Sequence, residues 1–255
     1  MASYFYCSAS YNRRVFKRNK LLHRETSQYG TYRVIDMMYN GRPSRMLFGD
    51  DKSPQSGISL DDSAELLFDY NQRFIEIVAS VRPQKVLVIG GGAFSLPMAI
   101  IERFDDITVD VVEIDPVLVD ISKQYFNLTN SPRLNIHVTD GRQFIEDVKS
   151  KYDLIIIDAF SGLDIPSSLV SVEAAKLYKS ALSPGGAVAL NFISAYHTTK
   201  PALAHRLIAT FEPIFSNVEI FPAEYSARVK KPDNLILIAT DGNTLQLDYF
   251  QSASI

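Results

Sequence analysis

The chain has 255 residues, of which 46% are hydrophobic and 22% are charged, the profile of an ordinary globular protein with one main domain. The formal net charge of -3 gives no overall case for a nucleic-acid partner, and no apolar run reaches the roughly 18 residues of a membrane span. The single cysteine, Cys7, cannot form an internal disulfide, and the first residues lack the apolar segment of a signal peptide, so we expect a soluble cytoplasmic protein.

The N-terminal part of the chain predicts a basic arm and a small β structure. The first 24 residues hold six Lys or Arg and no acid, which we interpret as a solvated or oligomer-facing arm rather than a nucleic-acid site. An Asn40-Gly41 turn between two strand-like runs indicates a hairpin, and residues 63–81 then have apolar residues, from Leu66 and Leu67 onward, at helical spacing. We therefore expect an appendage over residues 1–64 and a main domain over 65–255.

From residue 85 onward, short β-branched runs alternate with amphipathic segments of helical length, which is typical of a parallel sheet covered on both faces. The expected strands are 85–89, 108–114, 134–138, 153–158, 187–192, 218–221 and 235–240. Helices are expected to begin near Ser95, Pro116, Gly141 and Ser171, with a further one at about 200–211. No long helical segment separates the last two strands, which should pair antiparallel as a terminal hairpin.

Three successive glycines, Gly90, Gly91 and Gly92, stand between a buried strand and a helix, where they let a ligand approach the main chain. Glu113 ends the next strand, 21 residues after Gly92, at a position from which an acid can bind ribose hydroxyls. Asp140 and the glycine after it follow the third strand, where an acceptor can take the amino group of an adenine. Because successive parallel strands end at one edge of the sheet, an adenosine-containing cofactor is expected there.

Each of these elements also has a purely structural interpretation. The glycines can serve close packing alone, Glu113 can be a solvated strand-end carboxylate, and Asp140 can be only the N-cap of the following helix. The glycine loop and the ribose acid serve a dinucleotide as well as a sulfonium nucleoside. Ser95 stands where a dinucleotide motif has its third glycine, and the terminal hairpin also disfavours a dinucleotide. The four histidines show no metal-ligand spacing, so no metal is expected.

Five segments together resemble the spermidine synthases (polyamine aminopropyltransferases), within the class I methyltransferase fold. They are VLVIGGG, VDVVEIDPVLVDISKQYF, PRLNIHVTDGRQFI, YDLIIIDAFSG and LSPGGAVALN, in the family's order and spacing. The resemblance implies a Rossmann-like α/β fold whose seven-stranded methyltransferase sheet is mostly parallel with an antiparallel terminal hairpin. It also implies S-adenosylmethionine or its decarboxylated form as the cofactor, a small amine as the acceptor, and a homo-oligomer such as a dimer.

The resemblance also assigns roles by position. Gly90, Gly91 and Gly92 would cradle the methionine-derived part of the cofactor. Glu113 would hold the ribose with Ile114 against the adenine, while Asp140 and Gly141 would read the adenine edge. Asp158 keeps the first acid of the family's reacting centre, and a carboxylate there can bind the acceptor's ammonium and help to remove its proton. The alternative for Asp158 is a strand-end residue with no reacting role.

The sequence departs from the family around that centre. Ser161 stands at the position of the family's second acid, and Asp164 in the following loop is a candidate replacement. Ala93 stands where the family has an Asp directly after the glycines. The family has a tyrosine on the helix before the main sheet, and the position at the same spacing here is Phe68, followed by Asp69. The family's Gln near the polyamine corresponds to Asn191. We place Phe68, Asp69, Ser161, Asp164 and Asn191 on the acceptor side.

These departures leave the transferred group open. A polyamine site needs several carboxylates and aromatic faces to hold its ammonium groups, so the losses weaken the case for a decarboxylated cofactor and a diamine acceptor. Intact S-adenosylmethionine carries a carboxylate that an acid at position 93 would repel. Aminopropyl transfer in polyamine biosynthesis is what the resemblance implies, N-methyl transfer to a small amine is the alternative, and a nucleoside-binding paralogue without catalysis is a third.

Overall fold

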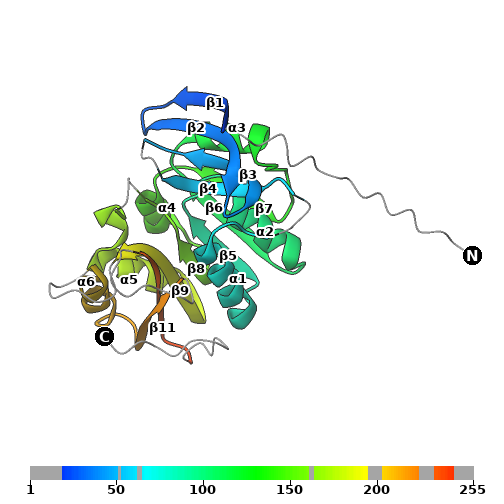
Figure 1. Ribbon diagram of the computed structural model, residues 1–255. Helices are drawn as coiled ribbons and strands as arrows, with labels where there is room; N and C mark the ends of the chain where they lie inside the picture. The colour runs from blue at the N-terminus through cyan, green and yellow to red at the C-terminus, as the bar shows by residue number, and fades with distance from the viewer. Residues whose placement is uncertain are drawn as a thin grey trace, which may run out of the picture.

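The structure is a computed structural model of the chain, and it describes residues 19–50, 53–61, 65–160, 164–194, 203–223 and 233–243. Two sheets organise it (Figure 1). The first is antiparallel, with its strands in chain order: β1 (Lys20–Thr26), β2 (Thr31–Tyr39), β3 (Arg42–Phe48) and β4 (Pro54–Ser59). Its centre is the predicted hairpin, since Tyr39 pairs with Arg42 around a turn in which Asn40 and Gly41 have positive φ. The outer strands β1 and β4 enlarge this hairpin to a four-stranded sheet.

The second sheet has seven strands in the order β10-β11-β9-β8-β5-β6-β7. Their bounds are β5 (Lys85–Ile89), β6 (Thr108–Glu113), β7 (Leu134–Val138), β8 (Tyr152–Ile157), β9 (Leu182–Ser194), β10 (Asn217–Pro222) and β11 (Asp233–Thr240). The five strands from β7 to β9 are parallel, whereas β11 runs antiparallel to both β9 and β10. This arrangement confirms the predicted fold class and its terminal hairpin. Strand β9 starts five residues before the predicted 187, because its pairing with β8 continues past a register shift near Tyr152.

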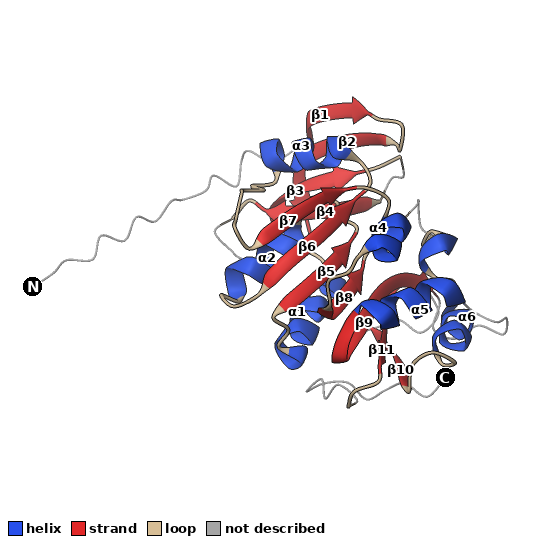
Figure 2. Cartoon of the chain, turned by 180° about the vertical axis from the view of Figure 1, so that it is seen from behind, coloured by secondary structure: helices blue, strands red, loops and turns tan. Residues whose placement is uncertain are grey.

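Helices cover both faces of this sheet, as Figures 1 and 2 show from opposite sides. They are α1 (Asp69–Val81), α2 (Ser95–Arg103), α3 (Pro116–Tyr125), α4 (Gly141–Asp147), α5 (Val172–Ala181) and α6 (Leu203–Phe211), with a short 3-10 helix η1 (Ser167–Leu169) before α5. Side chains of Asp115, Asp140 and Ser171 cap α3, α4 and α5 by accepting backbone N–H bonds. The linking helix begins at Asp69, so Leu66 and Leu67 precede it, because the backbone of Phe68 is still extended.

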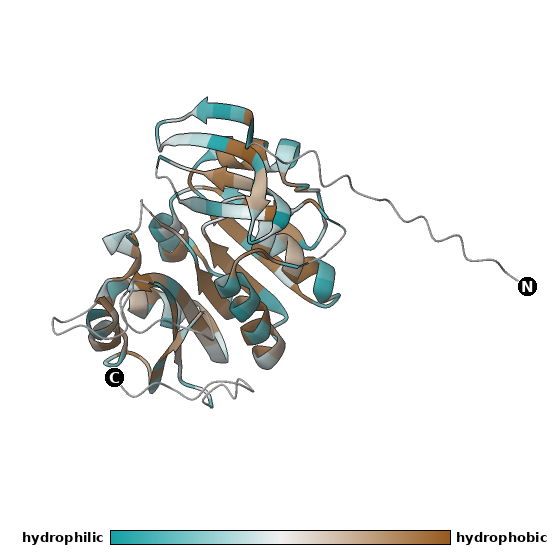
Figure 3. Ribbon diagram, viewed as in Figure 1, coloured by the Kyte–Doolittle hydropathy of each residue, from teal (hydrophilic) through white to brown (hydrophobic). Residues whose placement is uncertain are grey.

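The central strands are buried on both faces, which explains their continuous apolar runs such as Val86–Ile89. Figure 3 shows this hydrophobic concentration in the middle of the seven-stranded sheet. One core lies between the sheet and α1 and α2, and another lies under α4, α5 and α6. A third cluster joins the four-stranded sheet to α3 and the glycine loop; its buried members are Tyr32, Val34, Leu47, Ala93, Leu118, Ile121 and Phe126. The N-terminal sheet is therefore packed directly beside the carboxyl edge of the main sheet.

No helix in the described part of the chain combines the length and apolar character needed to cross a bilayer.

Candidate active site

The glycine loop follows β5 and is half-exposed at the carboxyl edge of the sheet. Gly90 has a φ of +100°, and a Cβ built on it would lie 2.4 Å from the carbonyl oxygen of Asp158, so no other residue fits there. A Cβ on Gly91 would lie 2.7 Å from the ring of Phe94. The glycines thus serve close packing, and the N–H of Gly90 donates within the chain to Val112 O at 2.9 Å. The role of the loop in cradling a ligand stays a prediction.

Glu113 fastens this loop. Its carboxylate is 6% exposed; Oε2 accepts the N–H of Gly91 at 2.9 Å and of Gly92 at 3.2 Å, and Oε1 accepts the N–H of Asp115 at 3.0 Å. Burial raises the pKa of Glu113, and these three backbone donors oppose the rise. A carboxylate has about four acceptor positions, so one is not used by these three donors. The structural role of Glu113 as an anchor for the loop was not visible in the sequence.

An exposed apolar surface lies next to Glu113. Ile114 is 37% exposed, and Val138, which pairs with Glu113 across β6 and β7, is 51% exposed. The structure thus leaves two large apolar side chains exposed beside the end of β6. Ile114 was predicted to lie against the adenine, whereas Val138 was not named. The position of Val138 at the end of the predicted strand 134–138 could have indicated it.

Asp140 and Gly141 form the first turn of α4. Asp140 is exposed, and its Oδ1 accepts the N–H of Gln143 at 2.9 Å, so its capping role is present. A Cβ on Gly141 would lie 2.6 Å from Cγ2 of Ile89, which means that the helix start packs tightly onto the end of β5. The predicted adenine turn and the glycine loop are therefore neighbours at the same edge, as the resemblance implied.

Asp158 comes directly after β8. Its backbone N–H donates to Ile89 O at 2.9 Å, and its Oδ1 accepts a bond from Asn191 Nδ2, also at 2.9 Å. Burial raises the pKa of Asp158 to about 6, and the bond from Asn191 opposes the rise. Within the described residues no Lys, Arg or His forms an ion pair with this carboxylate. A half-buried carboxylate with a neutral donor on one side is available for a cation or a proton on the other.

An aromatic group from the N-terminal region lies on this side of the sheet. Tyr70, buried in the first turn of α1, lies near enough to Asp158 that the charge of the carboxylate adds to burial in raising the pKa of Tyr70. The ring of Phe68 lies 5.6 Å from those of both Tyr39 and Tyr70. Tyr39, Phe68 and Tyr70 thus form one aromatic group. The sequence analysis missed Tyr70, although Tyr70, Phe74 and Ile77 have the i, i+4, i+7 spacing of one buried helix face.

Two buried amide oxygens in the same region lack a hydrogen-bond partner among the described residues: Asn71 Oδ1 and Asn191 Oδ1. Asn191 is 1% exposed and already uses its NH2 group on Asp158, while the Asn71 side chain contacts the hydroxyl of Tyr70. An unpartnered buried acceptor is costly unless a donor arrives. The surroundings of Asp158 therefore offer acceptors and need N–H or O–H donors.

The other residues predicted on the acceptor side are not all brought to Asp158. Asp164 is exposed, and no described contact joins it to Asp158. The charge of Asp69 acts on Tyr39, where it adds to burial in raising the pKa of the Tyr39 hydroxyl. Ser161 lies outside the described residues. In the described chain, no group of three or more His, Cys, Asp or Glu side chains is placed to hold a metal ion.

Ala93 does not face the open edge. Its side chain is fully buried in the cluster that joins the N-terminal sheet to α3, against residues such as Tyr32, Val34 and Leu118. The sequence suggested that a charge lost at this position bears on the choice of cofactor. The packing accounts for a small apolar residue at position 93, because an acid here would be surrounded by apolar side chains.

Comparison with known proteins decides the family. The model for the spermine/spermidine synthase domain matches residues 68–229, which include the glycine loop, Glu113, Asp158 and Asn191. The chain belongs to the spermine/spermidine synthase family. The predicted resemblance is thereby confirmed.

Two individual proteins illustrate the range of this family's relatives. The chain is 35% identical over 153 residues to a polyamine aminopropyltransferase of Vibrio vulnificus, covering 58% of this chain and 50% of that protein. It is 28% identical over 197 residues to the bovine eEF1A lysine and N-terminal methyltransferase, covering 73% of this chain and 25% of that protein. Both relatives are transferases, the class of enzyme that the sequence predicts, and the chain spans half of one and a quarter of the other.

Among solved structures, a probable spermidine synthase from Corynebacterium glutamicum superimposes with a TM-score of 0.75 and 21% identity. The superposition covers 87% of this chain and 81% of that one. Because the superposition spans most of both chains, the two proteins share the fold.

Proposed function

We propose that this chain binds an S-adenosylmethionine-type nucleoside along the carboxyl edge of its sheet and alkylates a small amine beside Asp158. The observation that carries the proposal is the group of acceptors around Asp158. Asp158 has a pKa of about 6, is bonded to Asn191 Nδ2, and has no cationic partner among the described residues, while Asn191 Oδ1 is buried and unpartnered. A primary amine or ammonium supplies the N–H donors that these oxygens lack.

The residues at the edge fit such a nucleoside. Gly91 and Gly92 have no side chain to cover their backbone, Glu113 retains an acceptor position, and Ile114 and Val138 present exposed apolar surface. When bound, the nucleoside supplies an alkyl carbon attached to a positively charged sulfur, whose departure as a neutral thioether needs no acid. The chain's own task is therefore to hold the amine in line with that carbon and to take its proton.

Asp158 is the residue placed for this task. An amine of pKa near 10.4 arrives mostly protonated at neutral pH, and a carboxylate can bind the ammonium and then accept its proton directly or through one water. With a pKa of about 6, Asp158 is mainly ionised at pH 7 and still a stronger base than an ordinary aspartate. Asn191 orients the carboxylate, and the nearby Tyr70 hydroxyl limits how a substrate amine can approach.

Two transferred groups are compatible with this site. The family and the Vibrio relative favour an aminopropyl group. A specific observation favours a methyl group: the bovine methyltransferase matches more of this chain than the Vibrio enzyme does, and no second acid joins Asp158 in the described residues to hold a polyamine. We propose aminopropyl transfer as the first function and N-methyl transfer as the second. A nucleoside-binding protein without catalysis remains the third hypothesis.

The deciding experiment compares the two donors directly. The purified chain is titrated by calorimetry with S-adenosylmethionine and with its decarboxylated form, and each mixture is then incubated with 1,4-diaminobutane and its products are identified by mass. Tighter binding of the decarboxylated form with an aminopropyl adduct supports the first function. Preference for intact S-adenosylmethionine with a methyl adduct supports the second. Binding without any adduct supports the third, and no binding of either donor refutes the proposal.

A further inference from the structure

Asp115 lies at the junction between the N-terminal sheet and Glu113. It stands two residues after Glu113, directly before α3, and it is fully buried. The strands β1 and β2 lie beside α3 in both views of the chain (Figures 1 and 2). Within the described residues no Lys, Arg or His forms an ion pair with the Asp115 carboxylate. A buried carboxylate without a cation needs hydrogen-bond donors.

Two of the donors to Asp115 come from the N-terminal sheet. Oδ1 accepts the N–H of Val117 at 3.0 Å, which caps α3. Oδ2 accepts the hydroxyl of Ser27, which lies in the turn between β1 and β2. The hydroxyl of Tyr32 in β2 bonds the same carboxylate, and this bond adds to burial in raising the pKa of Tyr32. Two hydroxyls of one sheet thus converge on the cap of a helix that covers the other.

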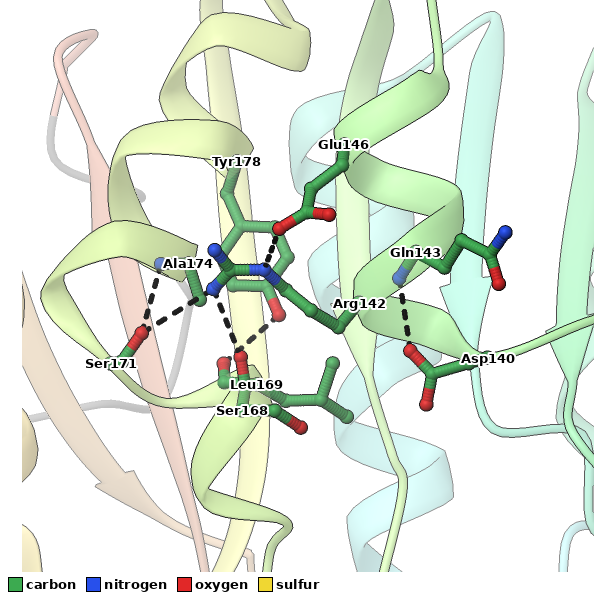
Figure 4. Close-up of polar contacts among 9 residues, drawn as sticks. All are labelled: Asp140, Arg142, Gln143, Glu146, Ser168, Leu169, Ser171, Ala174 and Tyr178. Atoms are coloured by element: carbon green, nitrogen blue, oxygen red, sulfur yellow. Dashed lines mark hydrogen bonds and ion pairs between the residues drawn. The ribbon is translucent and has the colours of Figure 1, made fainter.

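An ordinary helix cap does not need these contacts. Asp140, the cap of α4, is exposed, and Figure 4 shows its carboxylate bonded to the N–H of Gln143, at 2.9 Å. Capping accounts for Oδ1 of Asp115 in the same way. It accounts neither for the complete burial of Asp115 nor for the hydroxyls of Ser27 and Tyr32 on its carboxylate. These features need a second explanation.

The backbone of Asp115 supplies that explanation. Its N–H donates to Glu113 Oε1 at 3.0 Å. Glu113 Oε2 accepts two other backbone N–H groups, those of Gly91 and Gly92. Each oxygen of a carboxylate has about two acceptor positions, so the position that these three donors leave unused is on Oε1. The direction of that position therefore depends on the N–H of Asp115.

We propose that Asp115 is a positioning residue through which the N-terminal sheet orients Glu113 Oε1 toward a ribose hydroxyl. Ser27 and Tyr32 hold the Asp115 carboxylate, and the Asp115 N–H in turn holds Oε1. The N-terminal sheet thereby contributes to the selection of a ribonucleoside over a deoxynucleoside, in addition to packing on α3. This inference rests on the proposed function, since it needs a nucleoside at this edge.

Discrimination between ribose and deoxyribose tests this coupling. The probe is 5′-deoxy-5′-methylthioadenosine, a nucleoside with no charged tail, and its Kd by calorimetry is compared with those of its analogues that lack the 2′- or the 3′-hydroxyl. The proteins are the unaltered chain, Ser27→Ala, Tyr32→Phe and the double variant. Thr26→Ala removes the neighbouring hydroxyl of β1, and Tyr125→Phe alters a tyrosine packed against the cluster that contains Tyr32, so these two are the matched controls.

In the unaltered chain and both controls, we expect the loss of one ribose hydroxyl to weaken binding by about tenfold. Each single variant should reduce this factor, and the double variant should bring it to about threefold or less. Urea denaturation shows whether each variant is folded. The single variants, each of which keeps one hydroxyl on Asp115, decide the question if the double variant does not fold.

A merely structural role of Asp115 would weaken binding of the nucleoside and of its analogues equally. The discrimination factor would then be the same in the variants and in the unaltered chain, which would overturn the inference but not the proposed function. An unaltered chain that binds the nucleoside and both analogues equally well would have the same meaning. Absence of nucleoside binding to the unaltered chain would overturn both.

Discussion

Asn191 Nδ2, inside β9, and Asp158 Oδ1, directly after the neighbouring parallel strand β8, lie 2.9 Å apart. The bond gives the carboxylate one neutral donor in a setting where burial would otherwise raise its pKa further. Because the donor carries no charge, it orients Asp158 without neutralising it. The pair thus leaves the second oxygen of Asp158 for the amine of the proposed reaction.

Asp158→Asn should abolish transfer while leaving the nucleoside site intact. Asn can neither accept the proton nor hold an ammonium by charge, and loss of general-base catalysis typically costs about 10²–10⁴-fold in rate. We expect kcat to fall by at least about 100-fold and the nucleoside Kd by calorimetry to stay within about threefold. Asp106→Asn, an exposed aspartate before β6, is the control. Unchanged turnover would remove Asp158 from the mechanism.

Asn191→Ala should shift the pH dependence of the reaction. The reaction needs ionised Asp158, whose pKa is about 6, so kcat/KM should fall as the pH drops through 6. Removing the Asn191 donor removes the contribution that lowers this pKa, so the acid limb should move upward by about one pH unit. The measurement is kcat/KM between about pH 5 and pH 8. An acid limb that stays in place would show that another group controls it.

The sequence predicted β5, β6 and β8 closely because each is a short, largely buried run that ends at, or directly before, a glycine or an acid. Gly90 and Glu113 were found from these positions, and Asp158 was found from the family resemblance. Tyr70 was not named because counting back from the first strand of the main sheet at the family's spacing leads to Phe68, whereas the structure buries Tyr70 in the first turn of α1. Sequence periodicity shows which residues are buried but not which element covers them. For this reason the packing of Ala93 against the N-terminal sheet was not predicted, and neither were the outer strands β1 and β4.

Ala93→Asp tests whether position 93 is part of the core. The Ala93 side chain is fully buried among apolar residues of the N-terminal sheet and α3, so an acid there would lose its hydration without a partner. We expect a loss of more than about 3 kcal/mol in the free energy of unfolding, measured by urea denaturation. Ala93→Ser, which adds only a hydroxyl, should cost less. An Asp variant of normal stability that binds decarboxylated S-adenosylmethionine more tightly would instead place position 93 in the ligand site.

Glu113→Gln separates the two roles of that acid. The amide cannot accept all three backbone N–H bonds that the carboxylate accepts, so the glycine loop should loosen and nucleoside affinity should fall by at least about tenfold. Binding of 5′-deoxy-5′-methylthioadenosine and its 2′-deoxy analogue is compared in both proteins. If Glu113 also holds the ribose, removal of the 2′-hydroxyl weakens binding to the unaltered chain more than to the variant. Equal weakening in both would limit Glu113 to holding the loop. Glu102→Gln on the exposed side of α2 is the control.

Asp110 is a buried acid remote from the proposed chemistry, and it should govern stability at low pH. Its Oδ1 accepts from Asn135 Nδ2 at 2.8 Å, its Oδ2 accepts from the Tyr152 hydroxyl at 2.8 Å, and Lys85 Nζ lies 3.2 Å from Oδ2. Burial acts to raise the pKa of Asp110, but these bonds and the charge of Lys85 outweigh it, so the pKa lies below the usual 3.8.

A folded-state pKa below the unfolded one means that ionised Asp110 stabilises the fold above about pH 3.9, the unfolded value. This stabilisation is lost as the pH falls through the lower, folded pKa. Asp110→Asn places an amide NH2 group against one of these donors, so near pH 7 it should lower the free energy of unfolding by about 1–3 kcal/mol. Urea denaturation at neutral and acidic pH should show the difference from the unaltered chain shrinking below about pH 3.9. A difference that is the same at both pH values would mean that packing, rather than the charge of Asp110, supplies the stability.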